Sequence, residues 1–65
     1  MPDLTPRERE ALQLAAEGLQ YKQIARRLGL SAWTVKNHLA NARAKLDMET
    51  TLGAVAQGLR EGWLQ

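Results

Sequence analysis

The sequence has no cysteine, a single histidine and no long apolar run. Without cysteine it has no disulfides and no cysteine-based zinc site, and one histidine cannot hold a metal ion by itself. No stretch approaches the roughly 18 apolar residues that span a bilayer. The first ten residues also lack the apolar core of a signal peptide. We therefore expect a cytoplasmic protein that binds no metal, no cofactor and no membrane.

Signals of catalysis are missing too. The chain has no glycine-rich phosphate loop and no paired carboxylate site. No serine, cysteine or acid is spaced to form a triad with His38. We therefore expect that the protein is not an enzyme and that His38 is structural.

Strand patterns are absent, because no run alternates apolar and polar residues, and the apolar residues follow helical spacing instead. At 65 residues the chain is one domain, residues 1–65. A domain of this size buries only about 60% of the surface of its unfolded chain. The sequence thus predicts an all-α fold with a single small core.

The first helix has a well-defined start. Thr5 is a favourable N-cap, and Pro6 stands at the first helical position, where its missing N–H costs nothing. Glu8, three residues after the cap, completes a capping box. Because Gly18 is a typical stop signal, we expect this helix at about 6–17.

A tight turn connects the second and third helices. The second helix, at about 21–28, ends before Gly29, and Ser31 is a strong N-cap for a third helix at about 32–46. So short a connection forces the two helices to cross steeply, as in a helix-turn-helix unit. A fourth helix is expected at about 51–62.

Apolar residues at helical spacing form a stripe along the third and fourth helices, and in the third helix this stripe predicts the core side. In the third helix they are Val35, Leu39, Ala42 and Leu46. In the fourth helix they are Leu52, Val55, Ala56, Leu59 and Trp63. Gly53 and Gly58 each cost about 1 kcal/mol of helix stability relative to alanine. They indicate either the close approach of another helix or a loosely packed terminal helix.

Charge is segregated along the chain. Residues 18–46 carry six basic and no acidic residues, a net charge of +6, whereas the remainder carries three basic and seven acidic residues, a net charge of −4. This segregation favours one positive face that binds a polyanion, ahead of chance clustering on a solvated surface.

The side of the third helix opposite its apolar stripe has a distinctive composition. It contains Trp33, Lys36, Asn37, Ala40, Asn41 and Ala44. Small residues let a helix approach a groove closely, and lysine and asparagine are partners for base edges and phosphates. The alternative is a plain solvent-facing helix, but such a helix usually carries Glu–Lys pairs, and this face has no acid.

The stretch LTPREREALQLAAEGLQYKQIARRLGLSAWTVKNHLANARAKL resembles the C-terminal DNA-binding domain of the LuxR/FixJ/NarL family. The matching pieces are LTPRE, IARRLGLS, TVKNH and KL together with the Leu12–Gly18 stretch, in this order. The stretch covers 43 of the 65 residues, and the tail resembles the fourth helix of the family. Single motifs of this length are weak, but the ordered set is specific.

The resemblance implies a four-helix LuxR-type helix-turn-helix domain that binds double-stranded promoter DNA as a dimer. It also implies that the third helix lies in the major groove. The protein would be a sequence-specific transcription regulator, either free-standing or the effector domain of a response regulator, with RNA polymerase as a candidate partner. The implied dimer contact lies on the fourth helix, at Leu52, Val55, Ala56 and Leu59.

Three positions depart from the family pattern. Gln20 stands where the family often has Ser or Thr, and Thr51 stands where it usually has Arg near the start of the fourth helix. Ala40 stands where some members carry a base-contacting polar residue. Base reading at Ala40 is therefore either apolar, through a thymine methyl group, or absent.

The leading candidates for base contacts are Lys36 and Asn37, because lysine donates to guanine and asparagine pairs bidentately with adenine. Ala40 and Asn41, one turn further along, are secondary candidates. For Lys36 a simple phosphate contact is nearly as well supported.

Contacts with the DNA backbone are expected from residues near the starts of the second and third helices and from two basic residues near the end of the third helix. At a helix start, free N–H groups also attract anions. These residues are Tyr21, Lys22, Ser31, Trp33, Thr34, Arg43 and Lys45. For Trp33 two interpretations stay open: an exposed contact with a partner, or packing back onto the domain. Arg26 and Arg27 either reach the flanking backbone or pair with the acids of the first helix.

Two other functions fit the same helical layout. One is a protein–protein interaction module, which Trp33 favours and the acid-free face of the third helix opposes. The other is a domain like region four of a sigma factor, over which the LTPRE and TVKNH strings favour the LuxR type.

Overall fold

The computed structural model describes residues 2–65, and in this range it contains helices and no strand. The helices are α1 (Pro6–Ala16), α2 (Tyr21–Leu28), α3 (Ala32–Leu46) and α4 (Thr51–Glu61). The predicted all-α fold with four helices is confirmed. Helices α1 and α4 end one residue earlier than expected, because Glu17 and Gly62 serve as C-caps.

The caps that start the helices are formed by side chains. The Thr5 hydroxyl accepts from the Glu8 N–H at 3.1 Å, and the Glu8 carboxylate accepts from the Thr5 N–H at 3.0 Å, which confirms the capping box. The Ser31 hydroxyl accepts from the Thr34 N–H at 3.0 Å. At the start of α4 the Thr50 hydroxyl caps the Gly53 N–H at 2.9 Å.

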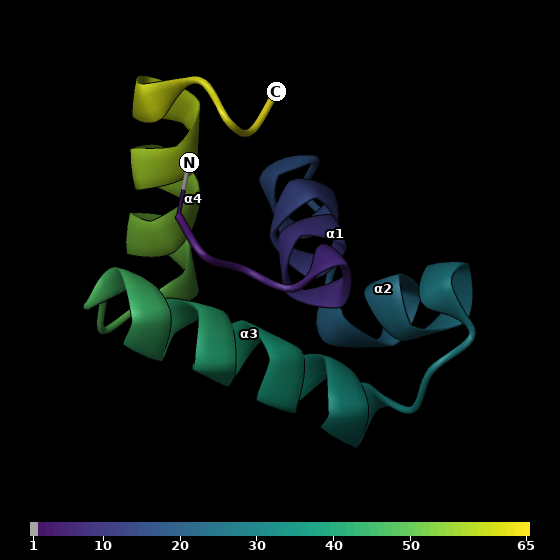
Figure 1. Ribbon diagram of the computed structural model, residues 1–65. Coiled ribbons are helices and arrows are strands. Elements are labelled where there is room, and N and C mark those ends of the chain that lie inside the picture. The colour runs from purple at the N-terminus through teal and green to yellow at the C-terminus, as the bar shows by residue number, and fades with distance from the viewer. Residues whose placement is uncertain (1) are drawn as a thin grey trace.

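The turn between α2 and α3 depends on one glycine. Gly29 has φ +70° and ψ +34°, in the left-handed region where a Cβ is penalised. The Leu30 N–H then donates to the Ala25 carbonyl at 2.9 Å and closes the end of α2. This turn sends the chain directly into α3 at a steep angle to α2 (Figure 1).

Helix α3 lies across one side of the domain, with the other three helices packed against it (Figure 1). Its predicted stripe of Val35, Leu39, Ala42 and Leu46 is buried. Against it pack apolar residues of the first two helices, namely Ala11, Leu12, Leu14, Ile24 and Ala25. Because the inner side of α3 is fixed in the core, its opposite side is turned to solvent.

The apolar stripe expected on α4 is divided between the core and the surface, because Val55 and Trp63 are buried and its other three members are exposed. Leu52 is 78% exposed, Leu59 is 48% exposed and Ala56 is also exposed. The buried residues of the helix are Ala54, Val55 and Gly58. The C-terminal residues fold back and cover the side of the helix that contains Gly58, so this side is buried instead of the whole apolar stripe.

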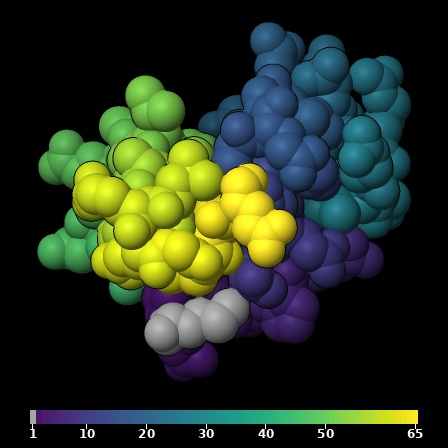
Figure 2. All heavy atoms as spheres, turned by 90° about the horizontal axis from the view of Figure 1, so that it is seen from above, coloured from purple at the N-terminus to yellow at the C-terminus, as the bar shows by residue number. Residues whose placement is uncertain are grey.

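The C-terminal residues that fold back contact both α4 and α1. A Cβ built at Gly58 would lie only 2.5 Å from Cδ1 of Leu64, so the glycine permits the close approach. The Arg9 guanidinium donates to the Trp63 carbonyl at 3.2 Å, and Gln13 exchanges two hydrogen bonds with the backbone of Gln65. Figure 2 shows the C-terminal residues lying against α1. Gly58 thus serves close packing, but of the chain's own C-terminus rather than of another helix.

Candidate nucleic-acid interface

The outer side of α3 presents the predicted base-contacting residues to solvent. Lys36, Asn37 and Asn41 are exposed, and Ala40 is half-buried between them. Trp33, in the first turn, is 72% exposed, so it does not pack back onto the domain. The face therefore combines a cation, two amides and a large aromatic side chain, with no carboxylate on the helix.

The first turn of α3 carries two hydroxyl groups that bind each other. The Ser31 hydroxyl donates to the Thr34 hydroxyl at 2.9 Å while it caps the helix. Ser31 is exposed and Thr34 is half-buried. The capping arrangement therefore fixes the position of both groups at the positive end of the helix dipole.

The start of α2 lies beside α3. Gln20, an unusual N-cap, has its N–H bound by the Gln23 side chain at 2.8 Å. The next two residues, Tyr21 and Lys22, are exposed. The Lys36 ammonium nitrogen lies 5.5 Å from the centroid of the Tyr21 ring, so residues of α2 and α3 meet at this face.

Two basic residues near the end of α3 are engaged inside the domain. Arg43 donates to the Thr51 hydroxyl at 2.9 Å, and Lys45 binds the Glu8 carboxylate at 2.8 Å. The first contact joins α3 to the first residue of α4, so the threonine that departs from the family pattern still anchors that helix. The sequence had suggested DNA contacts for Arg43 and Lys45 and did not reveal these structural partners, which come from distant segments.

Glu8 is the one charged residue classed as buried among residues 2–65, with a side chain 4% exposed. Burial raises the pKa of its carboxyl group, but hydrogen bonds from Lys45 and Thr5 and the charge of Lys45 outweigh burial, so the pKa lies below its ordinary value. Glu8 is therefore held as a carboxylate that ties α1 to α3.

Apart from Lys45, the basic residues of the 18–46 segment form no ion pair within residues 2–65. Within residues 2–65 the ion pairs are Arg7–Glu10 and Lys45–Glu8. Arg26 and Arg27 are exposed and take part in neither, so the predicted pairing with acids of the first helix is not found. Their charges therefore remain available to a polyanion.

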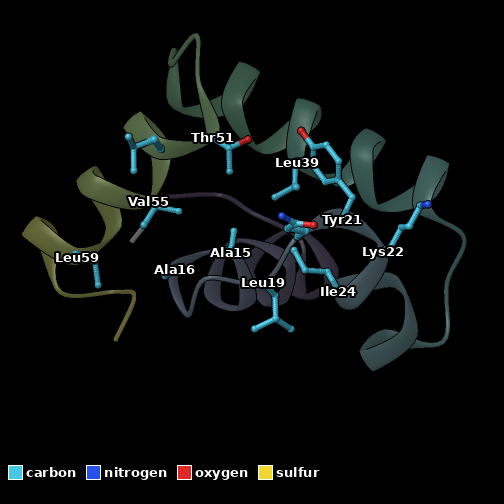
Figure 3. Close-up of a pocket in the computed structure, with 12 residues that line it drawn as sticks. Ala15, Ala16, Leu19, Tyr21, Lys22, Ile24, Leu39, Thr51, Val55 and Leu59 are labelled. Atoms are coloured by element: carbon cyan, nitrogen blue, oxygen red, sulfur yellow. The ribbon is translucent and has the colours of Figure 1, made fainter.

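The outer side of α4 forms a second feature. Leu52, Ala56 and Leu59 are exposed, whereas Val55, the fourth residue expected at a dimer contact, is 7% exposed. Leu52, Val55 and Leu59 also line an open, mainly apolar groove of about 820 Å³ between α4 and the end of α1, which Tyr21 borders (Figure 3). Exposed apolar surfaces of this kind are typical of interaction sites.

A metal site and a membrane-spanning helix are both absent from the part of the chain that the structure describes. Residues 2–65 contain no cluster of His, Asp and Glu side chains suited to a metal ion. None of the helices in this range is long and apolar enough to span a membrane.

The steep α2–α3 pair and the acid-free outer face of α3 define a helix-turn-helix protein of the DNA-binding class. The sequence model of the family described as bacterial regulatory proteins, luxR family, matches residues 2–58. The chain belongs to this family, and the resemblance seen in the sequence is confirmed.

Individual relatives agree with this assignment. The spore germination protein GerE of Bacillus subtilis is 42% identical over 64 residues, which cover 98% of this chain and 86% of GerE. The transcriptional regulatory protein DesR of the same organism is 34% identical over 62 residues, and the chain spans only 31% of its length. A solved structure of the transcription factor GerE matches 95% of this chain and 92% of its own with a TM-score of 0.89 at 39% identity. These relatives are regulators of transcription rather than enzymes.

Proposed function

We propose that α3 enters the major groove of a specific DNA site and that the domain thereby regulates transcription in the cytoplasm. The observation that carries the proposal is the outer face of α3, where Lys36, Asn37 and Asn41 are exposed without a neighbouring acid on the helix. An α-helix fits the major groove, and lysine and asparagine match the edges of guanine and adenine there.

Each residue has a distinct proposed role. Lys36 and Asn37 contact base edges, Asn41 is a second amide reader, and Ala40 allows close approach next to a thymine methyl group. The DNA backbone is contacted at the edges of the groove by Tyr21, Lys22, Ser31, Trp33 and Thr34. Arg43 and Lys45 reach the backbone only by sharing or exchanging the internal partners described above.

The proposal is tested by selecting a duplex from a random pool with the wild-type domain and measuring its affinity by fluorescence anisotropy over a salt series. Lys36→Ala and Asn37→Ala are each expected to weaken binding by about 1–3 kcal/mol and to relax preference at one base pair. If Lys36 instead contacts only phosphate, its variant weakens binding to all sequences alike and lowers the salt slope by about 1.

Arg60→Ala is the matched control for charge. Arg60 is an exposed cation in the last turn of α4, and this end of the helix is the one farther from α3 (Figure 1). Its variant should keep the sequence preference of the wild type. Absence of binding at low salt and high protein concentration would contradict the proposal and bring forward an interaction module that uses Trp33.

We further propose that two copies bind adjacent half-sites through the outer face of α4. A single domain of this size buries roughly 600–1,000 Å² on DNA, so tight binding needs a second copy. The exposed Leu52, Ala56 and Leu59 supply an apolar contact for it, whereas Val55 belongs to the core. This contact is independent of whether the domain acts alone or within a longer regulator that contacts RNA polymerase.

Leu52→Asp is expected to abolish cooperative binding to a duplex with two half-sites, because the like charges of two copies would meet at the contact. Binding to a duplex with one half-site should be unchanged, and this duplex is the internal control. Mobility-shift titrations of both duplexes measure the effect. Equal cooperativity in wild type and variant would place the dimer contact elsewhere.

A further inference from the structure

Lys36 and Tyr21 form a contact between the two helices of the helix-turn-helix unit. The ammonium nitrogen of Lys36 lies 5.5 Å from the centroid of the Tyr21 ring, inside the limit of about 6 Å for a cation–π contact. Figure 3 shows the Tyr21 side chain extending from α2 toward α3. The cation with the leading role in base reading is therefore already placed in the free domain.

No competing partner holds the Lys36 ammonium group. Neither ion pair found within residues 2–65 involves it, and α3 contains no acid over Ala32–Leu46. Across the same described residues, its side chain takes part in no hydrogen bond to another protein group. The Tyr21 ring is thus the protein group that this cation contacts in the structure.

The ring itself rests on a fixed support. Tyr21 is the first residue of α2, directly after the Gln20–Gln23 capping hydrogen bond, and Ile24 one turn later is 1% exposed. Tyr21 is 39% exposed, so part of the residue is covered by the domain. A lysine without such a support moves freely about its four-carbon chain.

We propose that Tyr21 is a positioning residue that orders Lys36 over its ring before DNA is bound and thereby sets how strongly Lys36 discriminates between bases. This inference rests on the proposed function of α3. Ordering the cation in advance reduces the entropy that is lost when it docks on a base edge. The ring supplies the effect, and the hydroxyl group that suggested a phosphate contact from the sequence is not needed for it.

The test measures how tightly the duplex selected by the wild-type domain is bound by the variants Tyr21→Leu, Tyr21→Phe and Lys36→Met. Tyr21→Leu removes the ring and should weaken binding about two- to fivefold, the size of an exposed cation–π contact. Tyr21→Phe keeps the ring, so it should keep the base preference of the wild type and lose only what a phosphate contact of the hydroxyl group contributes. In a Lys36→Met background, Tyr21→Leu and Tyr21→Phe should bind equally, because the ring then has no cation to order, and thermal unfolding of each variant checks that the fold is kept.

The contact is also measured without DNA. Ring currents should shift the side-chain methylene protons of Lys36 upfield in NMR spectra of the wild type and Tyr21→Phe, and this shift should vanish in Tyr21→Leu. The inference would be overturned by equal weakening in Tyr21→Phe and Tyr21→Leu, by a difference between these two variants that persists in the Lys36→Met background, or by tighter binding of Tyr21→Leu. If the wild type selects no duplex, the proposed function itself fails. A ring-current shift that is still present would then show that the Tyr21–Lys36 contact exists and that the failure lies in DNA binding.

Discussion

Lys45→Met is expected to lower the free energy of unfolding by about 1–3 kcal/mol, because it leaves the Glu8 carboxylate buried without its cationic partner. The carboxylate oxygen and the ammonium nitrogen are 2.8 Å apart in the wild type, and the Glu8 side chain is 4% exposed. The Lys45 side chain is 40% exposed, so water replaces part of the lost contact and the effect stays below that of a fully buried pair. For 65 residues, a total stability of about 3–10 kcal/mol is typical, so the loss is a large fraction.

The pH dependence of this effect has a defined sign. The folded-state pKa of Glu8 lies below its unfolded value, so the pair contributes stability above the unfolded pKa of about 4.3 and loses it as the pH falls through the folded pKa. Lys45→Met removes both the hydrogen bond and the charge of Lys45, which lower the pKa of Glu8, so the pKa in the variant should lie above that in the wild type. The difference in stability between wild type and variant should therefore be largest near neutral pH and shrink on acidification.

Urea denaturation at several pH values measures both effects, and the exposed Arg7–Glu10 pair supplies the matched control. Arg7→Met removes the same kind of partner from a pair with both side chains about half exposed, and should cost at most about 1 kcal/mol. Glu8→Gln in the Lys45→Met background should restore part of the stability, because no charge then remains buried. A Lys45→Met loss no larger than that of Arg7→Met would show that the Glu8 pair contributes nothing beyond a surface contact.

Gly58→Ala is expected to destabilise the domain by about 1–3 kcal/mol through overpacking, although helix propensity alone predicts a gain of about 1 kcal/mol. The added Cβ would lie 2.5 Å from Cδ1 and 2.6 Å from Cγ of Leu64, and 3.1 Å from Cη2 of Trp63. Both side chains are buried between α4 and the rest of the domain. Relief of the clash therefore requires the C-terminal segment to move away from α4.

Thermal unfolding of a double-mutant cycle tests this explanation. In a Leu64→Ala background the two closest atoms are gone, so Gly58→Ala should cost clearly less than it does in the wild type. Gly53→Ala is a second comparison, because its Cβ would meet only the Thr50 hydroxyl at 3.1 Å and the Met48 sulfur at 3.5 Å. Unchanged or increased stability in Gly58→Ala would mean that the C-terminal segment is not packed on α4 in solution.

Local features of the sequence were sufficient to predict the helices and the exposed outer face of α3. The Thr5–Glu8 capping box, Gly29 and Ser31 fixed where helices begin and end, because these signals act over three or four residues. The stripe from Val35 to Leu46 predicted the buried side of α3, and with it the exposed side that carries Lys36 and Asn37. A helix that is strongly apolar along one side can pack against the core in only one orientation.

The orientation of α4 and the partners of the charged residues were decided by the tertiary structure alone. Helix α4 has apolar residues on more than one side, so its burial depended on the return of Trp63 and Leu64, which cover Gly58. The pairing of Lys45 with Glu8 joins residues 37 positions apart, and the meeting of Lys36 with Tyr21 crosses the turn between two helices. Helical spacing says which residues share a face, but which faces meet is determined by how the whole chain closes around its core.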